Sequence, residues 1–450
     1  MAYDLGIIGA GPAGYVAAER AGKNGLSTVL FDKQFIGGVC LNEGCIPTKT
    51  LLHTAKLYEY AKEGKKYGLD LEHVSFDISR LMQRKNKMVK KLVGGIKSQL
   101  KNSQVKMVMD EAAILEKNSD HIKLQAGDDV FECKNLLLAT GSETFFPPIP
   151  GLKKENVYTN REILQIEEIP NEMTIIGGGV IGIEFADFFA TMGTKVTVIE
   201  MLDEIINGMD RELAAMLRKT LTKKGVDIKL SAKVTEMNNN DITFEENGEQ
   251  QKIASDHILL SAGRKPVVEL PGIEKLDIEY DNGGIKIDQY CRTNTPHVYA
   301  AGDVTGYSLF AHTASREGEV AVNHILEKKD LMRYEAVPAV VYTHPEVSGV
   351  GLTEEEARKR NVSYEVRSLP MAYAGRYVIE NEGVNGLCKI LVGKQYGNIL
   401  GIHVLGSPSS EIIFGGVMAI EEQLTIEEFQ EMIFPHPTVS EIFKETAFKK

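Results

Sequence analysis

The apolar positions of this chain form short strand-like runs and helix-like stretches, and one order of such elements occurs twice. An apolar run ends in Ile7-Ile8, a glycine turn and a helix over 13–24 follow, and the next apolar run ends at Phe31. The same order recurs from Ile175, with a helix over 184–192 and a strand over 194–199. Strand, turn, helix and strand in this order predict a parallel βαβ unit, so we expect two such units.

The glycine turns of the two units lie at a constant offset of 168 residues, reading IIGAGPAG over 7–14 and IIGGGVIG over 175–182. Each second strand is followed by an acid, Asp32 or Glu200, which lies 18 residues beyond the third glycine. In such units the first glycine makes the turn, the second lets backbone approach a pyrophosphate, and the third lets the helix pack on the strand. The acid accepts hydrogen bonds from ribose hydroxyls. The repeat therefore predicts two dinucleotide sites.

The pattern outside the two units is more varied. The sequence predicts helices over 51–66 and 78–101 and short strands over 111–142. A strand over 297–300 leads into Ala301-Gly302-Asp303. From about residue 335 no further glycine turn occurs, and the chain is expected to form strands over 337–342, 386–392 and 399–404 and a helix over 409–423. This last segment is typical of a separate domain.

Composition and charge exclude some classes of partner. Of the 450 residues, 43% are hydrophobic and 25% are charged, as in ordinary globular proteins. The net charge of −12 gives no basic footprint for nucleic acid or an anionic membrane. Asp4 and the lack of Lys or Arg before the first apolar run are unlike a secretory signal. We therefore expect a cytoplasmic protein that binds neither nucleic acid nor membrane.

Candidate chemistry is concentrated in GGVCLNEGCIPTK over 37–49, directly after the first acid. On a regular helix the Cα atoms of Cys40 and Cys45 would lie roughly 8.6 Å apart, beyond the reach of a disulfide. If the pair bonds, the backbone must be distorted, and Gly44 and Pro47 permit this. A distorted disulfide in a small loop is easily reduced and suits catalysis. The alternative is two reduced, buried thiols, but beside a dinucleotide unit a redox pair is favoured.

The other cysteines and histidines suggest less chemistry. Five cysteines cannot form a complete disulfide framework, and Cys133 and Cys291 are expected to be structural. His312, His344 and His403 show no metal-ligand spacing, so no metal is expected.

Taken together, these motifs resemble the pyridine nucleotide–disulfide oxidoreductase family. The resemblance rests on the cysteine segment, the two dinucleotide units, Ala301-Gly302-Asp303 and HPTVSE over 436–441, and it covers essentially the whole chain. It implies an α/β fold with two Rossmann-like dinucleotide-binding domains, one for FAD and one for NAD, plus a C-terminal α+β dimerisation domain. The implied boundaries are 1–145 and 271–334 for the FAD domain, 146–270 for the NAD domain and 335–450 for the dimerisation domain.

Within this family the pattern is most similar to the branch that oxidises dihydrolipoyl groups to lipoyl disulfide with NAD⁺. That branch serves 2-oxo acid dehydrogenase and glycine-cleavage complexes, so lipoyl domains and core subunits are implied partners. Members that use NADPH carry arginines after the second strand, whereas 200–204 here reads EMLDE, and acids repel a 2′-phosphate. The alternatives are another NAD(P)H-dependent disulfide reductase, or a flavin-binding assembly subunit without turnover. The intact cysteine pair argues against the second.

The resemblance also implies a role for individual residues. Cys40 is the exchange thiol, Cys45 faces the flavin, and Lys49 stabilises a nearby thiolate. Glu184 pairs with Lys49 beneath the nicotinamide. His436, which taken alone is more often a turn residue, becomes the acid/base, and Glu441 orients it.

In the family this histidine comes from the partner subunit, which implies a homodimer. Asp303 holds the ribityl chain of FAD, and Asp32 binds the adenine-side ribose at a place where the family usually has Glu. The residues expected to bind FAD or NAD are Gly9, Gly11, Pro12, Ala13, Gly14, Asp32, Lys33, Gly38, Cys40, Lys49, Ala112, Thr140, Gly141, Ser142, Gly177, Gly178, Gly179, Val180, Ile181, Gly182, Glu200, Val234, Gly263, Arg264, Asp303 and Ala311.

Overall fold

The computed structural model describes residues 2–238 and 240–449, which fold into two compact units. The first unit comprises Met1–Thr50, Ser79–Phe145 and Gly263–Arg333. The second comprises Leu51–Ile78, Phe146–Ala262 and Tyr334–Lys450. Within the described ranges, no helix is long and apolar enough to span a bilayer.

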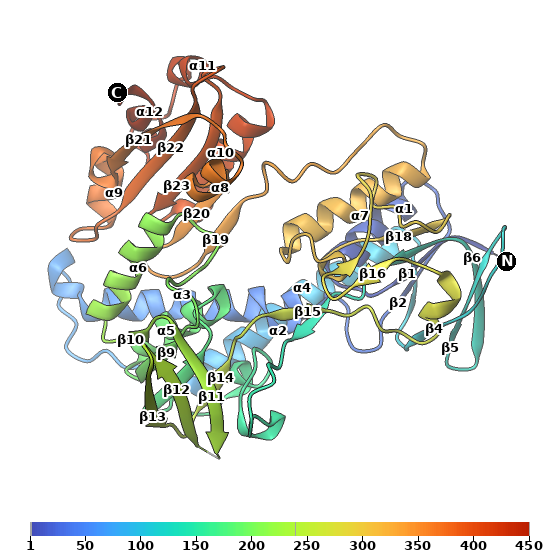
Figure 1. Ribbon diagram of the computed structural model, residues 1–450, viewed down its shortest axis with the longest axis horizontal. Helices are drawn as coiled ribbons and strands as arrows, with labels where there is room; N and C mark the ends of the chain where they lie inside the picture. Colours follow the sequence, from blue (N-terminus) through green and yellow to red (C-terminus); the bar gives the residue numbers. More distant parts are fainter. Residues whose placement is uncertain (1, 239, 450) are drawn as a thin grey trace. The chain divides into compact units, whose positions relative to one another are not determined.

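A seven-stranded sheet forms the centre of the first unit (Figure 1). Its order is β3-β2-β1-β6-β5-β4, with β18 also paired to β6. β1, β2, β3, β6 and β18 pair in parallel, whereas β4, β5 and β6 form an antiparallel meander. The strands are β1 (Tyr3–Ile8), β2 (Thr28–Phe31), β3 (Lys106–Val108), β4 (Ala112–Lys117), β5 (Ile122–Ala126), β6 (Asp129–Leu138) and β18 (Val298–Ala300).

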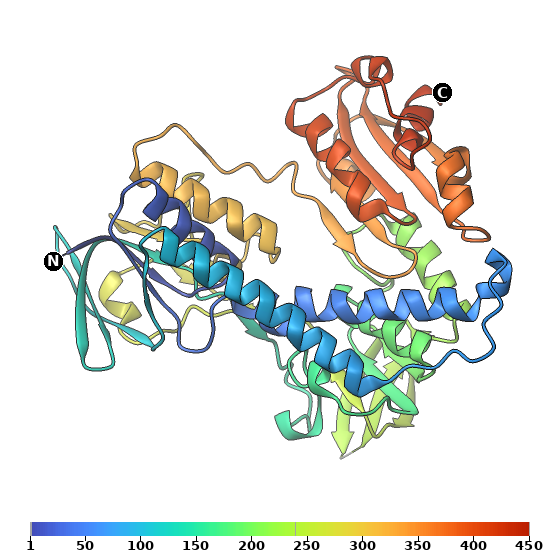
Figure 2. The ribbon, with the colours of Figure 1, turned by 180° about the vertical axis from the view of Figure 1, so that it is seen from behind.

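Two helices of the first unit, α1 (Pro12–Lys23) and α7 (Ala311–Ile325), lie side by side in both views (Figures 1 and 2). Small residues allow this approach, because a Cβ on Gly318 would lie 2.5 Å from the carbonyl oxygen of Ala13. α1 begins with Pro12, a residue that suits the first helical position. The other helices and strands with residues in this unit are α2 (Gly38–Glu43), α3 (Cys45–Lys62), α4 (Ile78–Asn102), β7 (Ser142–Thr144), β15 (Arg264–Pro266), β16 (Tyr280–Asp281) and β17 (Gly284–Ile285).

The second unit contains a parallel sheet of order β10-β9-β8-β14. The central strands β8 and β9 are almost wholly buried, as expected for a parallel sheet covered on both faces. β11, β12 and β13 form a separate antiparallel sheet. The elements are β8 (Glu172–Ile176), α5 (Val180–Met192), β9 (Lys195–Ile199), α6 (Arg211–Lys223), β10 (Asp227–Lys229), β11 (Ala232–Asn238), β12 (Asp241–Glu246), β13 (Glu249–Ala254) and β14 (Ile258–Leu260).

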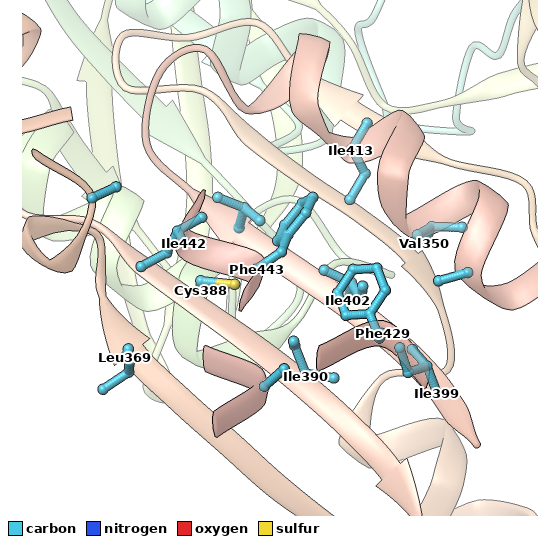
Figure 3. Close-up of a cluster of buried hydrophobic side chains, with 14 of the residues drawn as sticks. Val350, Leu369, Cys388, Ile390, Ile399, Ile402, Ile413, Phe429, Ile442 and Phe443 are labelled. Atoms are coloured by element: carbon cyan, nitrogen blue, oxygen red, sulfur yellow. The ribbon is translucent and has the colours of Figure 1, made fainter. Parts of the chain in front are cut away.

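The C-terminal part of the second unit is an antiparallel sheet of order β19-β20-β23-β22-β21. Figure 3 shows its core, in which Cys388 lies among Ile402, Ile442 and Phe443. Cys388, like Cys133 and Cys291, is buried, in keeping with a structural role. The elements are β19 (Ala339–Val341), β20 (Val347–Gly351), α8 (Glu354–Lys359), β21 (Tyr364–Pro370), α9 (Gly375–Glu380), β22 (Leu387–Gly393), β23 (Ile399–Leu405), α10 (Ser409–Glu421), α11 (Ile426–Glu431) and α12 (Glu441–Phe448).

The expected fold class is confirmed, since two parallel βαβ units and a separate α+β segment are present. The helix expected over 51–66 is present, but both predicted ends are wrong. Helix α3 spans Cys45–Lys62, and Gly64–Tyr67 forms a separate 3₁₀ turn. Pro47 does not prevent the early start, because the first turn of a helix tolerates proline. The apolar pattern also does not predict strand β20, because Gly349 interrupts the run of apolar residues there. A Cβ there would lie 2.5 Å from Nδ1 of His403.

Candidate redox and dinucleotide-binding site

The first glycine turn has the geometry that its sequence predicts. A Cβ on Gly9 would lie 2.1 Å from the carbonyl oxygen of Ala139, and one on Gly14 would lie 1.8 Å from that of Gly9. A Cβ on Gly11 would meet only the Cα of Gly38, at 3.9 Å. The first and third glycines are therefore needed for packing, whereas the second leaves room at the N-terminus of α1. Free backbone N–H groups of a helix start favour a phosphate there.

The second glycine turn repeats this arrangement. A Cβ on Gly177 would lie 2.5 Å from the carbonyl oxygen of Ser261, and one on Gly182 would lie 2.1 Å from that of Gly177. A Cβ on Gly179, the second glycine, would have nothing within 4 Å. α5 begins directly after it with Val180 and Ile181. Both turns thus fit the pyrophosphate of a dinucleotide.

The two acids bind the backbone of their own turns in the same way. Asp32 Oδ2 accepts from the N–H of Ala10 at 2.7 Å, and Glu200 Oε2 accepts from the N–H of Gly178 at 2.5 Å. Asp32 Oδ1 also accepts from the backbone of Gln34, and Glu200 Oε1 from that of Leu202. The shorter aspartate therefore still reaches its turn. Both carboxylates are fixed at the ends of their strands, where a ribose hydroxyl can donate to them.

The cysteine pair lies at a break between two helices. Gly44 separates α2, which carries Cys40, from α3, which begins with Cys45. The distorted backbone expected between the cysteines is therefore present. Cys40 and Cys45 are not joined by a disulfide, both are only partly buried, and their side chains are in hydrogen-bonding contact. They are close enough to exchange between dithiol and disulfide.

Lys49 and Tyr15 interact electrostatically with this pair. The contact with Cys45 and burial raise the pKa of the Cys40 thiol, and the positive charge of Lys49 lowers it. Burial raises the pKa of Tyr15, and the neighbouring charges of Cys40 and Cys45 add to that increase. Sequence reasoning overlooked Tyr15. Its signal was its position directly after the third glycine, on the helix that starts the first dinucleotide unit.

Asp303 is held by side chains from two other segments of the first unit. Ser142 Oγ donates to Asp303 Oδ2 at 2.5 Å, and Arg264 Nε donates to Ser142 Oγ at 2.7 Å. Burial raises the pKa of Asp303, while the Ser142 hydrogen bond and the Arg264 charge oppose the increase. The three residues therefore form one connected polar group.

Several further residues expected to bind FAD or NAD also lie in the first unit. Thr140 Oγ1 donates to the carbonyl oxygen of Val267 at 2.6 Å, and Gly141 accepts from the N–H of the same valine at 2.9 Å. Lys33 forms an exposed ion pair with Glu111 at 2.8 Å, so its role rests on the resemblance alone. Ala112 begins β4, Gly263 directly precedes β15 and Ala311 begins α7.

Two buried acids on α5 hold a distant loop of the second unit. Glu184 Oε1 accepts from the N–H of Tyr342 at 3.0 Å, and Asp187 Oδ2 accepts from the N–H of His344 at 2.8 Å. Burial, aided by the charge of Lys224, lowers the pKa of His344 to about 3, so this histidine is neutral. Lys49 belongs to the first unit and Glu184 to the second, and their pairing stays a prediction.

His436 and Glu441 form the expected pair in the second unit. His436 Nδ1 lies 2.8 Å from Glu441 Oε1, and Glu441 Oε2 accepts from the N–H of Thr438 at 2.9 Å. The Thr438 hydrogen bond, followed by the contact with His436, lowers the pKa of Glu441. The His436 side chain is 79% exposed, so its ring is available to a group outside this segment. Val234, another residue expected to bind FAD or NAD, is buried in β11.

Comparison with known proteins identifies the family. Residues 3–318 match the family described as pyridine nucleotide-disulphide oxidoreductase, and residues 337–447 match the dimerisation domain of that family. This chain belongs to the pyridine nucleotide-disulphide oxidoreductase family. Its C-terminal sheet is accordingly the family's dimerisation domain.

Relatives within the pyridine nucleotide-disulphide oxidoreductase family span the whole chain. A dihydrolipoyl dehydrogenase of Mycoplasma pneumoniae is 37% identical over 100% of this chain and 98% of its own length. One from Geobacillus stearothermophilus is 36% identical over 98% of this chain and 94% of its own length. Among solved structures, the HOCl-induced flavoprotein disulfide reductase RclA of Escherichia coli is 30% identical, with a TM-score of 0.86 and 99% of each chain covered. LpdA of Mycobacterium tuberculosis, 24% identical with a TM-score of 0.91 and 98% of each chain covered, shares the fold.

Proposed function

We propose that this chain is a flavoprotein that oxidises dihydrolipoyl groups to lipoyl disulfide, with NAD⁺ as the final electron acceptor. The observation that carries the proposal is the contact between Cys40 and Cys45 at the helix break, directly after the first dinucleotide turn. Full-length relatives named dihydrolipoyl dehydrogenase support the choice of substrate. FAD and NAD are the cofactors of the proposed enzyme, and the two glycine turns fit them.

The proposed sulfur exchange balances without a further reactant. A dihydrolipoyl thiol, deprotonated by His436, attacks Cys40 of the oxidised pair, the S–S bond breaks, and Cys45 leaves as the thiolate. The second dihydrolipoyl thiol displaces Cys40, forming the lipoyl disulfide and leaving both cysteines reduced. Bound FAD supplies the route by which these two electrons reach NAD⁺ as hydride. Lys49 stabilises the thiolate, and Glu441 orients His436.

The same proposal includes assembly and domain limits. His436 of one chain serves the cysteine pair of a second chain, so the active form is a homodimer, and the family's dimerisation domain supports this. Lipoyl domains and core subunits of multienzyme complexes are the proposed partners, and the proposed location is the cytoplasm. The domain limits stay those of the sequence: 1–145 and 271–334 for FAD, 146–270 for NAD and 335–450 for the interface.

Turnover assays on the purified holoenzyme test the proposal. We expect oxidation of dihydrolipoamide with NAD⁺, little turnover with NADP⁺, and none in Cys45→Ser. Cys133→Ala, a change at a buried cysteine outside the site, is the matched control and should keep activity. A protein that binds flavin but turns over no disulfide would instead be an assembly subunit.

A second candidate activity is the reduction of a different disulfide. The similarity to the flavoprotein disulfide reductase RclA, at 30% identity over 99% of each chain, favours it. Parallel assays with lipoamide and glutathione disulfide separate the two candidates. Faster turnover of glutathione disulfide would reject dihydrolipoyl oxidation as the main activity.

A further inference from the structure

Ser142 links two charged residues in the first unit. Arg264 binds this serine twice, with Nε donating to Oγ at 2.7 Å and a terminal nitrogen donating to the carbonyl oxygen at 2.6 Å. A guanidinium only donates, so Ser142 Oγ accepts from it and directs its own proton elsewhere. That proton goes to Asp303 Oδ2, at 2.5 Å. The hydrogen bonds therefore run in one direction, from Arg264 through Ser142 to Asp303. We call this chain of hydrogen bonds the relay.

The backbone holds all three residues in place. Ser142 and Arg264 lie on the paired strands β7 and β15. The turn before Asp303 is fixed because the N–H of Gly302 donates to the buried Glu317 at 2.6 Å. A Cβ on Gly302 would lie 3.3 Å from the Cβ of Ala13, on the first turn of α1. The relay thus ends beside the helix start of the first dinucleotide turn.

Arg264 lies among several negative groups of the same unit. Burial lowers the pKa of its guanidinium, and the charges of Asp303, Glu43, Cys45 and Glu143 oppose that decrease. A buried carboxylate without compensation would take up a proton. The relay gives Asp303 one hydrogen bond and one nearby positive charge, which favour the ionised form.

We infer that Arg264 is a positioning residue that acts on the flavin through Ser142 and Asp303 rather than by touching it. The inference rests on the proposed function, because it takes FAD as the ligand of the first unit. It replaces the direct contact expected for Arg264 from the sequence. The relay keeps the Asp303 carboxylate charged and fixed, the form that accepts hydrogen bonds from the hydroxyl groups of a ribityl chain.

A double-mutant cycle on FAD affinity tests this inference. FAD is removed from the full-length protein and from three variants, Arg264→Met, Asp303→Asn and the double variant, and rebinding is measured from flavin fluorescence. Each single change should weaken binding about tenfold or more, since each removes a charge-assisted hydrogen bond. If Arg264 acts through Asp303, the double variant should bind FAD no more weakly than Asp303→Asn alone. The inference would be overturned if the two single losses of FAD affinity multiplied in the double variant. It would also be overturned if Arg264→Met bound FAD as tightly as the unaltered protein.

Two further measurements keep the result clear. Arg316→Met breaks an ion pair with Asp330 in the same unit and should leave FAD affinity unchanged. If Arg264→Met does not fold, the cycle is repeated with Arg264→Lys and Ser142→Ala, whose effects must again fail to multiply. An unaltered apoprotein that binds no FAD would reject the proposed function itself. If the unaltered apoprotein binds FAD but the losses of FAD affinity multiply in the double variant, only the relay is rejected.

Discussion

Asp32 and Glu200 occupy equivalent places in the two dinucleotide units, and each binds the backbone between the first two glycines of its turn. A carboxylate has about four lone-pair sites, so these bonds leave capacity for ribose hydroxyls. The aspartate is one methylene shorter than the glutamate usual at this place in the family. It nevertheless accepts from Ala10, Gln34 and Phe35. Its shorter reach therefore does not detach it from the turn.

Glu200 should set the choice between NAD(H) and NADP(H). The residue is only 9% exposed and its carboxylate is fixed by Gly178 and Leu202, so a 2′-phosphate beside it would meet a fixed negative charge. We expect Glu200→Ala to raise the KM for NADH about tenfold, the value of a lost hydrogen bond to a charged group, and to lower the KM for NADPH, because the charge that repels the 2′-phosphate is removed. Steady-state kinetics with both cofactors measure this. Glu172→Gln, an exposed acid on β8, is the control. Equal use of NADPH by the unaltered protein would contradict the assignment.

Lys49 should govern the reactivity of the reduced cysteine pair. Its charge lowers the pKa of Cys40, so its removal raises that pKa and reduces the thiolate fraction at a given pH. For Lys49→Met we expect the alkylation of Cys40 by iodoacetamide at pH 8 to slow about three- to tenfold, and its pH midpoint to move upward. Mass spectrometry locates the modified cysteine. Lys49→Arg keeps the charge and should keep the rate, whereas equal rates in all three proteins would remove Lys49 from the site.

At the scale of secondary-structure elements, the break between α2 and α3 positions Cys40 and Cys45. A Cβ on Gly44 would lie 3.1 Å from the carbonyl oxygen of Val39 and 3.3 Å from the Cα of Cys40. Gly44→Ala should therefore move the start of α3 away from Cys40. We expect incomplete disulfide formation, seen by thiol titration after mild oxidation, and about a ten- to hundredfold loss of turnover. Gly94→Ala on α4, where a Cβ has open space, should change neither. A fully formed disulfide in Gly44→Ala would show that this close approach is not needed.

Local and periodic features are what the sequence predicts well. The glycine turns, their helices and the break near Gly44 depend on residues that are close along the chain. The Arg264–Ser142 and Ser142–Asp303 contacts join residues 122 and 161 positions apart, and no spacing rule connects them. Strand β20 was overlooked because Gly349 makes room for His403, a residue of the paired strand β23 that lies far away along the chain. The individual residues could be predicted, but their connections required the fold.

A buried lysine joins α6 to the C-terminal sheet in the second unit. Lys389 on β22, with a side chain only 3% exposed, lies 3.1 Å from Asp210, 2.8 Å from Glu212 and 3.0 Å from Glu354. Burial opposes its charge, but these acids outweigh burial and raise its pKa. A lysine with a raised pKa stabilises the fold below its unfolded pKa, and this stability is lost as pH rises through the folded value.

Removing this lysine should destabilise the protein at neutral pH. We expect Lys389→Met to cost about 3 kcal/mol or more, because it leaves Asp210 buried without its partner, and to lower the Tm by several degrees. The difference from the unaltered protein should shrink above about pH 10.4, where unfolded lysine loses its charge. Thermal unfolding followed by circular dichroism across this pH range measures both effects. The exposed Lys394→Met should have almost no effect. A Tm difference that does not change with pH would show that packing, not charge, explains the loss.

At the scale of the whole molecule, the site residues divide between the two units. The cysteine pair and Asp303 belong to the first unit, and Glu200 and His436 to the second. His436 is 79% exposed while its Nδ1 is held by Glu441, so the ring is oriented yet open to another group. The dimerisation domain that carries it matches the family over 337–447. These observations support a site completed by a second chain.

Subunit mixing tests whether two chains share each site. Cys45→Ser and His436→Gln should each be inactive as homodimers, because one lacks the disulfide and the other lacks the base. After unfolding, mixing in equal amounts and refolding, half of the dimers contain one chain of each kind. In such a dimer one site has both defects and the other has neither. Lipoamide turnover should therefore recover to about one quarter of the unaltered level, as a two-fold symmetric interface requires. Each variant refolded alone is the control and should stay inactive. If differently tagged chains are shown to exchange and activity does not return, His436 acts within its own chain or takes no part in the reaction.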